Sequence, residues 1–243
     1  MLRDALRVAA AAALVFAARA AAGPAQPPSS GLWSASLAAY NRNDQDAALR
    51  DARALLAREP DNPLYRRHEA AVLYARRDFA GAAAALERFM ASAPEPTQAC
   101  PLIANAYRRL NDAPRFLDAL KRCLAFDPHN AEWAFNYAQG LEETGDLRGA
   151  AALFSRLAGD GFLGGAIALG RVRLKQGAPD RALAVARAAL EREPGNTAAH
   201  LVAAQAAFML GDRPEARRHW SQARKSAPSH PEVLRLGRLL GAP

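Results

Sequence analysis

The 243-residue chain is poor in the residues that build catalytic and metal sites. It has two cysteines, five histidines and 7% aromatic residues, and no two of the histidines stand at a metal-binding spacing. No serine lies in a G-x-S-x-G elbow, and the dense glycines of 159–165 are not followed by Gly-Lys-Ser/Thr. The neighbouring Glu142 and Glu143 would point roughly 100° apart on a helix, so they form no acid–base couple. The sequence therefore predicts no enzyme and no cofactor or metal site.

Long apolar runs are also missing, apart from one segment near the N-terminus. Residues 1–22 combine two early arginines with an apolar run at 8–18, which is too short to span a bilayer. Small residues follow this run, and the whole is the pattern of a secretory signal peptide. We expect cleavage near Ala22 or Ala25, a Pro/Ser-rich linker at 23–30, and a periplasmic or secreted protein. The alternative is an uncleaved leader that tethers the chain to a membrane.

Negative charge is in the minority, with 24 acidic against 32 basic residues and a net charge of +8. A basic patch can bind nucleic acid or an acidic partner. Here the arginines are scattered along the expected exposed helix faces and do not cluster in one arm. The charge therefore indicates solubility. We expect no nucleic-acid partner, and contact with a membrane only through an uncleaved leader.

Alanine within amphipathic helical patterns is what the sequence has in abundance. Hydrophobic residues make up 51% of the chain, and alanine both favours helix and permits close helix approach. Residues 63–94 show two apolar stripes at helical spacing, interrupted at Arg77-Asp78. Asn62 can cap the first helix, where the next residue is a proline, and Pro94 closes the second. This pattern predicts a helical hairpin that is too small to bury its apolar faces alone.

The same hairpin recurs at a period of about 34 residues. Three markers keep phase along the chain: a small residue in the second helix, a turn that ends in aspartate, and a closing proline. The first marker is Ala48, Ala82, Ala150, Ala182 and Ala216, with the larger Phe116 in the third unit. The turns are Asn43-Asp44, Arg77-Asp78, Asn111-Asp112, Gly145-Asp146 and Gly211-Asp212, and the prolines are Pro60, Pro94, Pro128, Pro194 and Pro228. Each hairpin must bury its core against its neighbours, so the pattern predicts an elongated array.

These markers resemble the tetratricopeptide repeat (TPR) family, and the junction A-G-D-G-F-L-G-G-A-I-A-L-G from Ala158 also resembles a Sel1-like repeat. The resemblance implies an all-α fold: a right-handed α-solenoid of about six helical hairpins with a C-terminal capping helix, over residues 31–243. The units are expected at about 29–62, 63–96, 97–130, 131–162, 163–196 and 197–230. The cap is expected at 231–240, where Val233, Leu234, Leu236 and Leu240 are available to cover the last repeat.

The two cysteines, Cys100 and Cys123, are expected at adjacent ends of the antiparallel hairpin in the third unit. In the oxidising compartment that the leader predicts, they could form a disulfide. The bond would close a loop of about 22 residues and contribute about 3 kcal/mol of stability. The alternative is a pair of buried thiols that fill small core positions. A Cα–Cα separation beyond about 7 Å would exclude the bond.

The resemblance also implies a function. In this family the first helices of successive units line a concave channel that holds an extended or helical peptide. By repeat phase, the peptide groove would contain Trp33, Tyr40, Arg67, Tyr74, Asn105, Arg108, Arg109, Phe135, Gln139, Glu142, Arg171, Lys175, Gln205 and Phe208. This implies a non-enzymatic exported scaffold or adaptor for a protein or peptide partner in envelope assembly, such as pilus biogenesis, polysaccharide export or cytochrome c maturation. The alternative is an accessory protein whose groove arginines bind an anionic glycan or another small polyanion.

Overall fold

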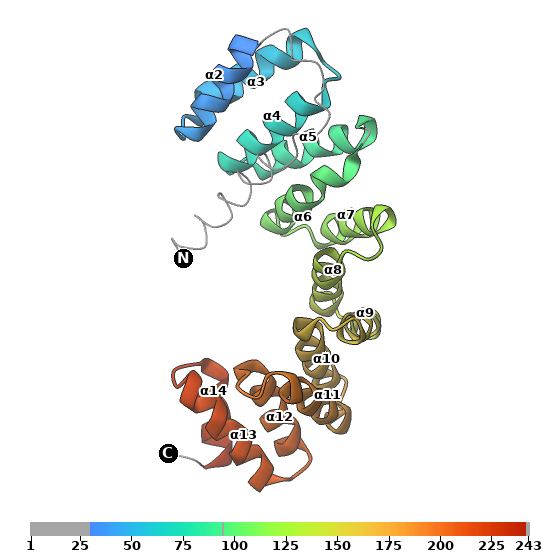
Figure 1. Ribbon diagram of the computed structural model, residues 1–243, viewed down its shortest axis with the longest axis vertical. Helices are drawn as coiled ribbons and strands as arrows, with labels where there is room; N and C mark the ends of the chain where they lie inside the picture. The colour runs from blue at the N-terminus through green and yellow to red at the C-terminus, as the bar shows by residue number, and fades with distance from the viewer. Residues whose placement is uncertain (1–29, 94, 242–243) are drawn as a thin grey trace.

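The computed structural model describes residues 30–93 and 95–241, and Figure 1 shows them as a continuous array of helices. Consecutive helices pair as hairpins, each hairpin packs on the next, and the array bends into an open arc. No strand occurs among the described residues. The predicted all-α solenoid is therefore confirmed. The predicted leader, its cleavage sites, the linker up to residue 29 and Pro94 lie outside the described residues.

The described residues form six hairpins, here called units 1 to 6, and a capping helix. The first helices are α2 (Ser30–Asn41), α4 (Pro63–Ala75), α6 (Cys100–Arg109), α8 (Ala131–Glu143), α10 (Leu163–Lys175) and α12 (Thr197–Met209). The second helices are α3 (Gln45–Arg58), α5 (Phe79–Ser92), α7 (Ala113–Phe126), α9 (Leu147–Gly159), α11 (Pro179–Arg192) and α13 (Arg213–Ser226). The cap is α14 (Pro231–Leu240), and a short 3-10 helix, η1 (Pro96–Ala99), precedes α6.

The turn inside every hairpin repeats one backbone conformation. Its αL residue has a positive φ, between 57° and 91°, and is Asn43, Arg77, Asn111, Gly145, Gly177 or Gly211. The next residue is the N-cap of the second helix. In five units it is an aspartate whose side chain accepts a hydrogen bond from the backbone N–H three residues on: Asp44, Asp78, Asp112, Asp146 and Asp212. In unit 5 this position is Ala178, which provides no side-chain cap.

The first helices begin with a different cap. The Asn62 side chain accepts hydrogen bonds from the backbone N–H groups of Leu64 and Tyr65, and Pro63 occupies the first turn, as the sequence predicts. Asn130 and Asn196 cap α8 and α12 in the same way. Phe162 stands at this position before α10 and makes no side-chain cap. Unit 5 therefore lacks both of the caps that its neighbours have.

Alanine and leucine fill the core, and the marker alanines are fully buried: Ala48, Ala82, Ala150, Ala182 and Ala216. The larger Phe116 of unit 3 is also buried, at 4% exposed. It fits because Gly140 in α8 faces it: a Cβ built on Gly140 would lie 2.7 Å from the Phe116 ring. A bulky residue in one unit is thus matched by a missing side chain in the next.

Two local details differ from the sequence prediction. Unit 3 opens with η1, so its first α-helix begins only at Cys100 and has no side-chain cap. In α14, Val233, Leu236 and Leu240 cover unit 6, but Leu234, expected beside them, is 49% exposed. The reason is helical geometry, because Leu234 is turned by roughly 100° from Val233. None of the described helices is long and apolar enough to cross a bilayer.

Candidate functional site

All of the residues predicted for the groove lie on first helices, and we call them the first-helix wall. They are Trp33 and Tyr40 on α2, Arg67 and Tyr74 on α4, Asn105, Arg108 and Arg109 on α6, Phe135, Gln139 and Glu142 on α8, Arg171 and Lys175 on α10, and Gln205 and Phe208 on α12. In Figure 1, α6 and α8 lie on the inner side of the arc, and α7 and α9 lie on its outer side. The helices that carry the middle of the wall therefore line the concave side.

At the N-terminal end of the wall, the aromatic side chains of unit 1 pack against unit 2. The Trp33 ring centroid lies 5.4 Å from that of Tyr65 and 5.0 Å from that of His68. The Tyr40 ring lies 5.8 Å from His68. Both wall aromatics are half-buried. The two rings therefore stabilise the packing of α2 against α4, and only part of their surface is available to a partner.

Beneath these rings lies a buried serine–histidine pair that the sequence analysis did not single out. The Ser36 hydroxyl donates to the Ala48 carbonyl oxygen at 2.9 Å, and its oxygen lies 2.8 Å from Nε2 of His68. Burial lowers the pKa of His68 to about 4, so the ring is neutral at pH 7. Ser36 and His68 are 0% and 1% exposed, so no substrate can reach them. The pair is structural.

The second unit contributes Arg67 and Tyr74, and both already contact neighbouring side chains. Arg67 donates a hydrogen bond to the side-chain oxygen of Gln98, in η1 of the next unit. The Tyr74 ring packs edge-on against Phe79, with the centroids 5.2 Å apart. The Arg67 contact crosses the boundary between units 2 and 3, whereas the Tyr74 contact lies within unit 2.

The centre of the wall carries exposed donor groups. Asn105 donates to the Pro101 carbonyl in its own helix at 2.8 Å, so its amide is partly used. Arg108 stacks over Phe116 at 4.7 Å and reaches the Asn136 side-chain oxygen at 3.3 Å. Arg109 lies 5.9 Å from the Phe79 ring. Neither arginine forms an ion pair with a carboxylate of the described residues, so both charges face solvent.

Glu142, Arg171 and Lys175 form one charged cluster across units 4 and 5. Arg171 donates to both Glu142 oxygens, at 3.0 and 2.7 Å, and Lys175 Nζ lies 2.7 Å from Oε1. The Glu142 carboxylate is 7% exposed, whereas the two cations are exposed. Burial alone raises the pKa of Glu142, but the hydrogen bonds from Arg171 and Lys175 outweigh it and hold the pKa below its ordinary value. The carboxylate is therefore ionised and neutralises much of the positive charge around it.

The remaining wall residues divide into two kinds. The Phe135 ring packs at a tilt against Phe154, with the centroids 5.5 Å apart, and edge-on against Phe162, at 5.3 Å. Phe208 packs into the apolar core beneath the cap. Gln139 and Gln205 are half-buried and make no side-chain hydrogen bond to a described residue. The two amides and the two central arginines are therefore among the wall groups that have unused hydrogen-bonding capacity.

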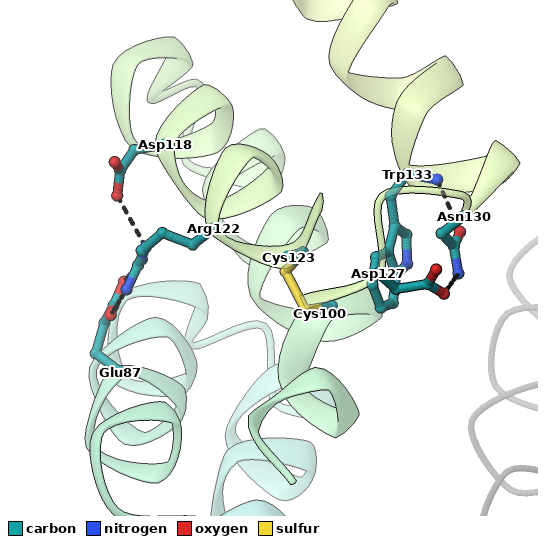
Figure 2. Close-up of a disulfide and its surroundings, with 8 residues drawn as sticks. All are labelled: Glu87, Cys100, Asp118, Arg122, Cys123, Asp127, Asn130 and Trp133. Carbon is teal, nitrogen blue, oxygen red and sulfur yellow. Dashed lines mark hydrogen bonds and ion pairs between the residues drawn. A yellow bond between two sulfur atoms is a disulfide. The ribbon is translucent and has the colours of Figure 1, made fainter. Parts of the chain in front are cut away.

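A disulfide fixes the open end of the hairpin behind this centre. Cys100 and Cys123 are bonded, with their Cα atoms 5.8 Å apart, and both are fully buried. Figure 2 shows the bond joining α6 and α7, with the Asp118 and Arg122 side chains also on α7 and Glu87 facing them from α5. Arg122 binds Glu87 through two hydrogen bonds of 2.8 and 2.7 Å. Unit 3 is thus joined covalently within itself and by charge to unit 2.

The two remaining buried histidines lie at the far end of the array. Nδ1 of His200 lies 2.9 Å from Nδ1 of His219, and Nε2 of His200 lies 2.9 Å from the Pro194 carbonyl oxygen. Both histidines are buried core residues, and their contact could not be foreseen from the sequence. No group of three or more His, Cys, Asp or Glu side chains that could hold a metal ion occurs among the described residues.

The contacts within the wall follow a rule that the sequence analysis missed. Glu142 and Arg171 are 29 residues apart, Arg108 and Asn136 are 28 apart, and Arg67 and Gln98 are 31 apart. Each separation is a few residues less than one repeat. A side chain on one first helix therefore meets a side chain that lies a few residues nearer the start of the next unit, and this offset could have identified Gln98 and Asn136 as partners.

Sequence comparison finds one family in this chain. Models of the tetratricopeptide repeat match residues 34–95 and residues 173–240, which together make up more than half of its length. The matched parts correspond to most of units 1 and 2, and to most of unit 5, unit 6 and the cap. No curated protein matches the sequence significantly.

Several solved structures share the fold. A tetratricopeptide repeat protein from Parabacteroides merdae matches with a TM-score of 0.65 at 15% identity, over 86% of this chain and 84% of that one. YrrB, described as a TPR protein with an unusual peptide-binding site, gives a TM-score of 0.63 at 16% identity, over 77% and 97%. PilW, described as a type IV pilus biogenesis factor, gives 0.59 at 18% identity, over 83% and 94%. At these identities the matches show the fold alone.

Proposed function

Because the chain belongs to the tetratricopeptide repeat family, whose fold is suited to protein interaction, we propose that it is a non-enzymatic scaffold. It holds a protein or peptide partner along the first-helix wall. The proposed setting is the cell envelope, in assembly processes such as pilus biogenesis, polysaccharide export or cytochrome c maturation.

The proposal rests on the exposed hydrogen-bonding side chains at the centre of the wall. Arg108 and Arg109 are exposed and have no carboxylate partner among the described residues. On α8, Gln139 lies one turn after Asn136, which Arg108 contacts, and its amide makes no side-chain hydrogen bond to a described residue. Planar guanidinium and amide groups suit the carbonyls and carboxylates of a peptide, and arginine is enriched at interfaces. The disulfide anchors the start of α6, the helix whose last turn carries both arginines.

The charged cluster in units 4 and 5 favours a peptide over a small polyanion. The polyanion alternative needs Arg67, Arg108, Arg109, Arg171 and Lys175 to act together. Arg171 and Lys175 instead surround the buried carboxylate of Glu142. The negative charge of Glu142 would repel a polyanion that bound to Arg171 and Lys175, whereas a peptide can bind at the centre of the wall without contacting Glu142.

Export is supported by two independent features. Residues 1–22 have the signal-peptide pattern, and the disulfide is a bond typical of oxidising compartments. The test is to quench cell fractions with acid, unfold the protein and alkylate its thiols. We expect protein in the periplasmic or secreted fraction whose Cys100 and Cys123 react only after reduction. Reactive thiols in a cytoplasmic protein would show that the export proposal is wrong.

The groove is tested by crosslinking in intact cells from a photoreactive residue at Gln139, followed by binding measurements with the captured protein. We expect Arg108→Ala with Arg109→Ala to weaken binding about tenfold, because centrally placed arginines often dominate an interface. Arg156→Ala is the matched control, since it removes an exposed arginine from the second helix α9. Equal binding by the double variant and the control would remove the groove proposal.

A further inference from the structure

Positive charge is concentrated in the C-terminal part of the array. Residues 30–162 carry 16 basic and 17 acidic side chains, a net charge of −1. Residues 163–241 carry 13 basic and 6 acidic side chains, a net charge of +7. The scatter expected from the sequence therefore hides a strong asymmetry along the solenoid. Such a field attracts anionic partners to one end of the molecule.

At this end, arginines and exposed apolar side chains meet along one edge. The capping helix α14 follows α13 as the first helix of another hairpin would. It therefore runs in the same direction as α12, and the C-terminal ends of α12 and α14 lie on the same side. Arg217, on the first turns of α13, donates to the Leu240 carbonyl at 2.7 Å and ties that side together. We define the basic–apolar edge as Met209, Leu210, Arg213, Arg217, Arg238 and Leu239.

The apolar side chains of the basic–apolar edge are highly exposed to solvent. Met209 and Leu210 are each 48% exposed, and Leu239 is 45% exposed. At the two turn positions that Met209 and Leu210 occupy, the other units have Asn41-Arg42, Ala75-Arg76, Arg109-Leu110, Glu143-Thr144 and Lys175-Gln176. Among the described turns, unit 6 is therefore alone in placing two large apolar side chains there. Neither serves the core.

The charges of the edge are available as well. Arg213 and Arg238 are exposed and make no side-chain hydrogen bond or ion pair with a described residue. Arg217 donates one hydrogen bond to the Leu240 carbonyl oxygen and forms no ion pair with a described residue, so its positive charge is not neutralised. Asp212 is the acidic residue of the turn, and its carboxylate is engaged in capping α13.

We propose that the basic–apolar edge docks on a membrane surface that contains anionic phospholipids. Arginines near such a surface are attracted by its negative potential. Met and Leu side chains beside them can enter the boundary between headgroups and acyl chains, which adds apolar burial. A soluble polyanion would use the arginines and leave the three apolar side chains in water. This contact is distinct from the tether expected of an uncleaved leader, and it does not rest on the partner proposed for the first-helix wall.

The test uses the full chain and sedimentation with vesicles of phosphatidylcholine alone or mixed with phosphatidylglycerol. We expect binding to the mixed vesicles only, and binding that weakens as salt rises. Arg213→Gln with Arg238→Gln should lower the partition coefficient about fivefold for each arginine removed. The same two positions changed to lysine should retain most of the binding, because the charge is kept.

The matched control is Arg148→Gln with Arg181→Gln, which removes the same charge from exposed sites on α9 and α11. Every protein carries the same residues 1–29, so any binding through that segment is common to all of them. The control should bind like the unchanged protein. An equal loss in both double variants would show that overall charge is responsible, and equal binding to pure phosphatidylcholine would show that no anionic lipid is needed. Either result overturns the proposal.

A second pair of changes separates lipid from a soluble polymer. Met209→Ser with Leu239→Ser should weaken vesicle binding severalfold, because the inserted apolar area is lost. The unfolding midpoint should stay unchanged, since both side chains are half exposed. If this variant binds vesicles normally and soluble polyglutamate competes for the same edge, the partner is an acidic polymer and the membrane proposal is wrong.

Discussion

The uncapped second helix of unit 5 gives the sharpest test of how the repeats are built. Five units place an aspartate at the N-cap, and its Oδ1 accepts from the N–H three residues on at 2.8–3.1 Å. Unit 5 has Ala178 there, so the corresponding N–H, of Arg181, lacks this partner. We predict that Ala178→Asp stabilises the protein by restoring the missing bond.

The expected gain is about 1 kcal/mol, the typical difference between aspartate and alanine at an N-cap. The backbone is nearly ready for it: ψ is 66° at Ala178 and 71–80° at the five aspartates, while φ is −114° compared with −76° to −96°. Pro179, at the first helical position, does not interfere, because the bond goes to the third. For a chain of this size the gain corresponds to a rise of about 2–4 °C in the unfolding midpoint.

The assay combines thermal unfolding with hydrogen exchange, because repeat arrays unfold in parts and a global midpoint can dilute a local change. Protection should rise most in the first turn of α11. Asp112→Ala should lower stability by about 1 kcal/mol, since it removes an existing cap. Ala184→Asp, on the exposed side of α11, adds the same charge without a cap and should destabilise by a few tenths of a kcal/mol.

Two outcomes would refute this reasoning. If Ala178→Asp gives no gain while Asp112→Ala is costly, the turn of unit 5 does not present a cap site like the others. If Ala184→Asp stabilises as much as Ala178→Asp, the added negative charge is the cause and the hydrogen bond is not.

Three further predictions concern buried groups. Burial lowers the folded-state pKa of His68 to about 4, so between pH 6.5 and 4 the unfolded chain binds more protons than the folded one. The free energy of unfolding should therefore fall by about 3 kcal/mol as the pH is lowered through this range. Urea titrations at several pH values measure this fall, and His68→Gln should make it smaller. Cys100→Ala with Cys123→Ala should cost about 3 kcal/mol, and an unchanged urea midpoint in non-reducing buffer would contradict this. Glu142→Gln should destabilise by about 2 kcal/mol, because a buried carboxylate that accepts charged hydrogen bonds from Arg171 and Lys175 is lost. A double-mutant cycle with Arg171→Gln measures the coupling, and additive effects would show that the pair contributes nothing.

Much of the fold could be predicted because its markers act locally. Alanine at Ala82 permits a close helix crossing, aspartate at Asp78 starts a helix, and asparagine at Asn62 starts another. Each works within a few residues, so their period shows in the sequence. The structure places helix starts at or within one residue of the expected unit boundaries in units 2, 4, 5 and 6. In unit 3 the prolines around Cys100 replaced the first turn by η1.

The pairing between units could not be predicted in the same way. Whether Glu142 faces solvent or Arg171 depends on the offset and tilt of α10 against α8, which no single unit encodes. The same holds for His68, whose burial results from Trp33 and Tyr40 reaching across from unit 1. The residues of the wall were placed on the right helices, but their neighbours decide which of them are available, and the role of the wall stays a prediction.

The position of the disulfide has a consequence for how the array comes apart. A linear stack frays from its two free ends, where each hairpin has a single neighbour. The covalent ring lies in the third of six hairpins, away from both ends. Loss of the outer hairpins on heating or under tension should therefore leave a crosslinked middle that keeps Arg108 and Arg109 on an intact helix, and recovery could begin there by restacking outward.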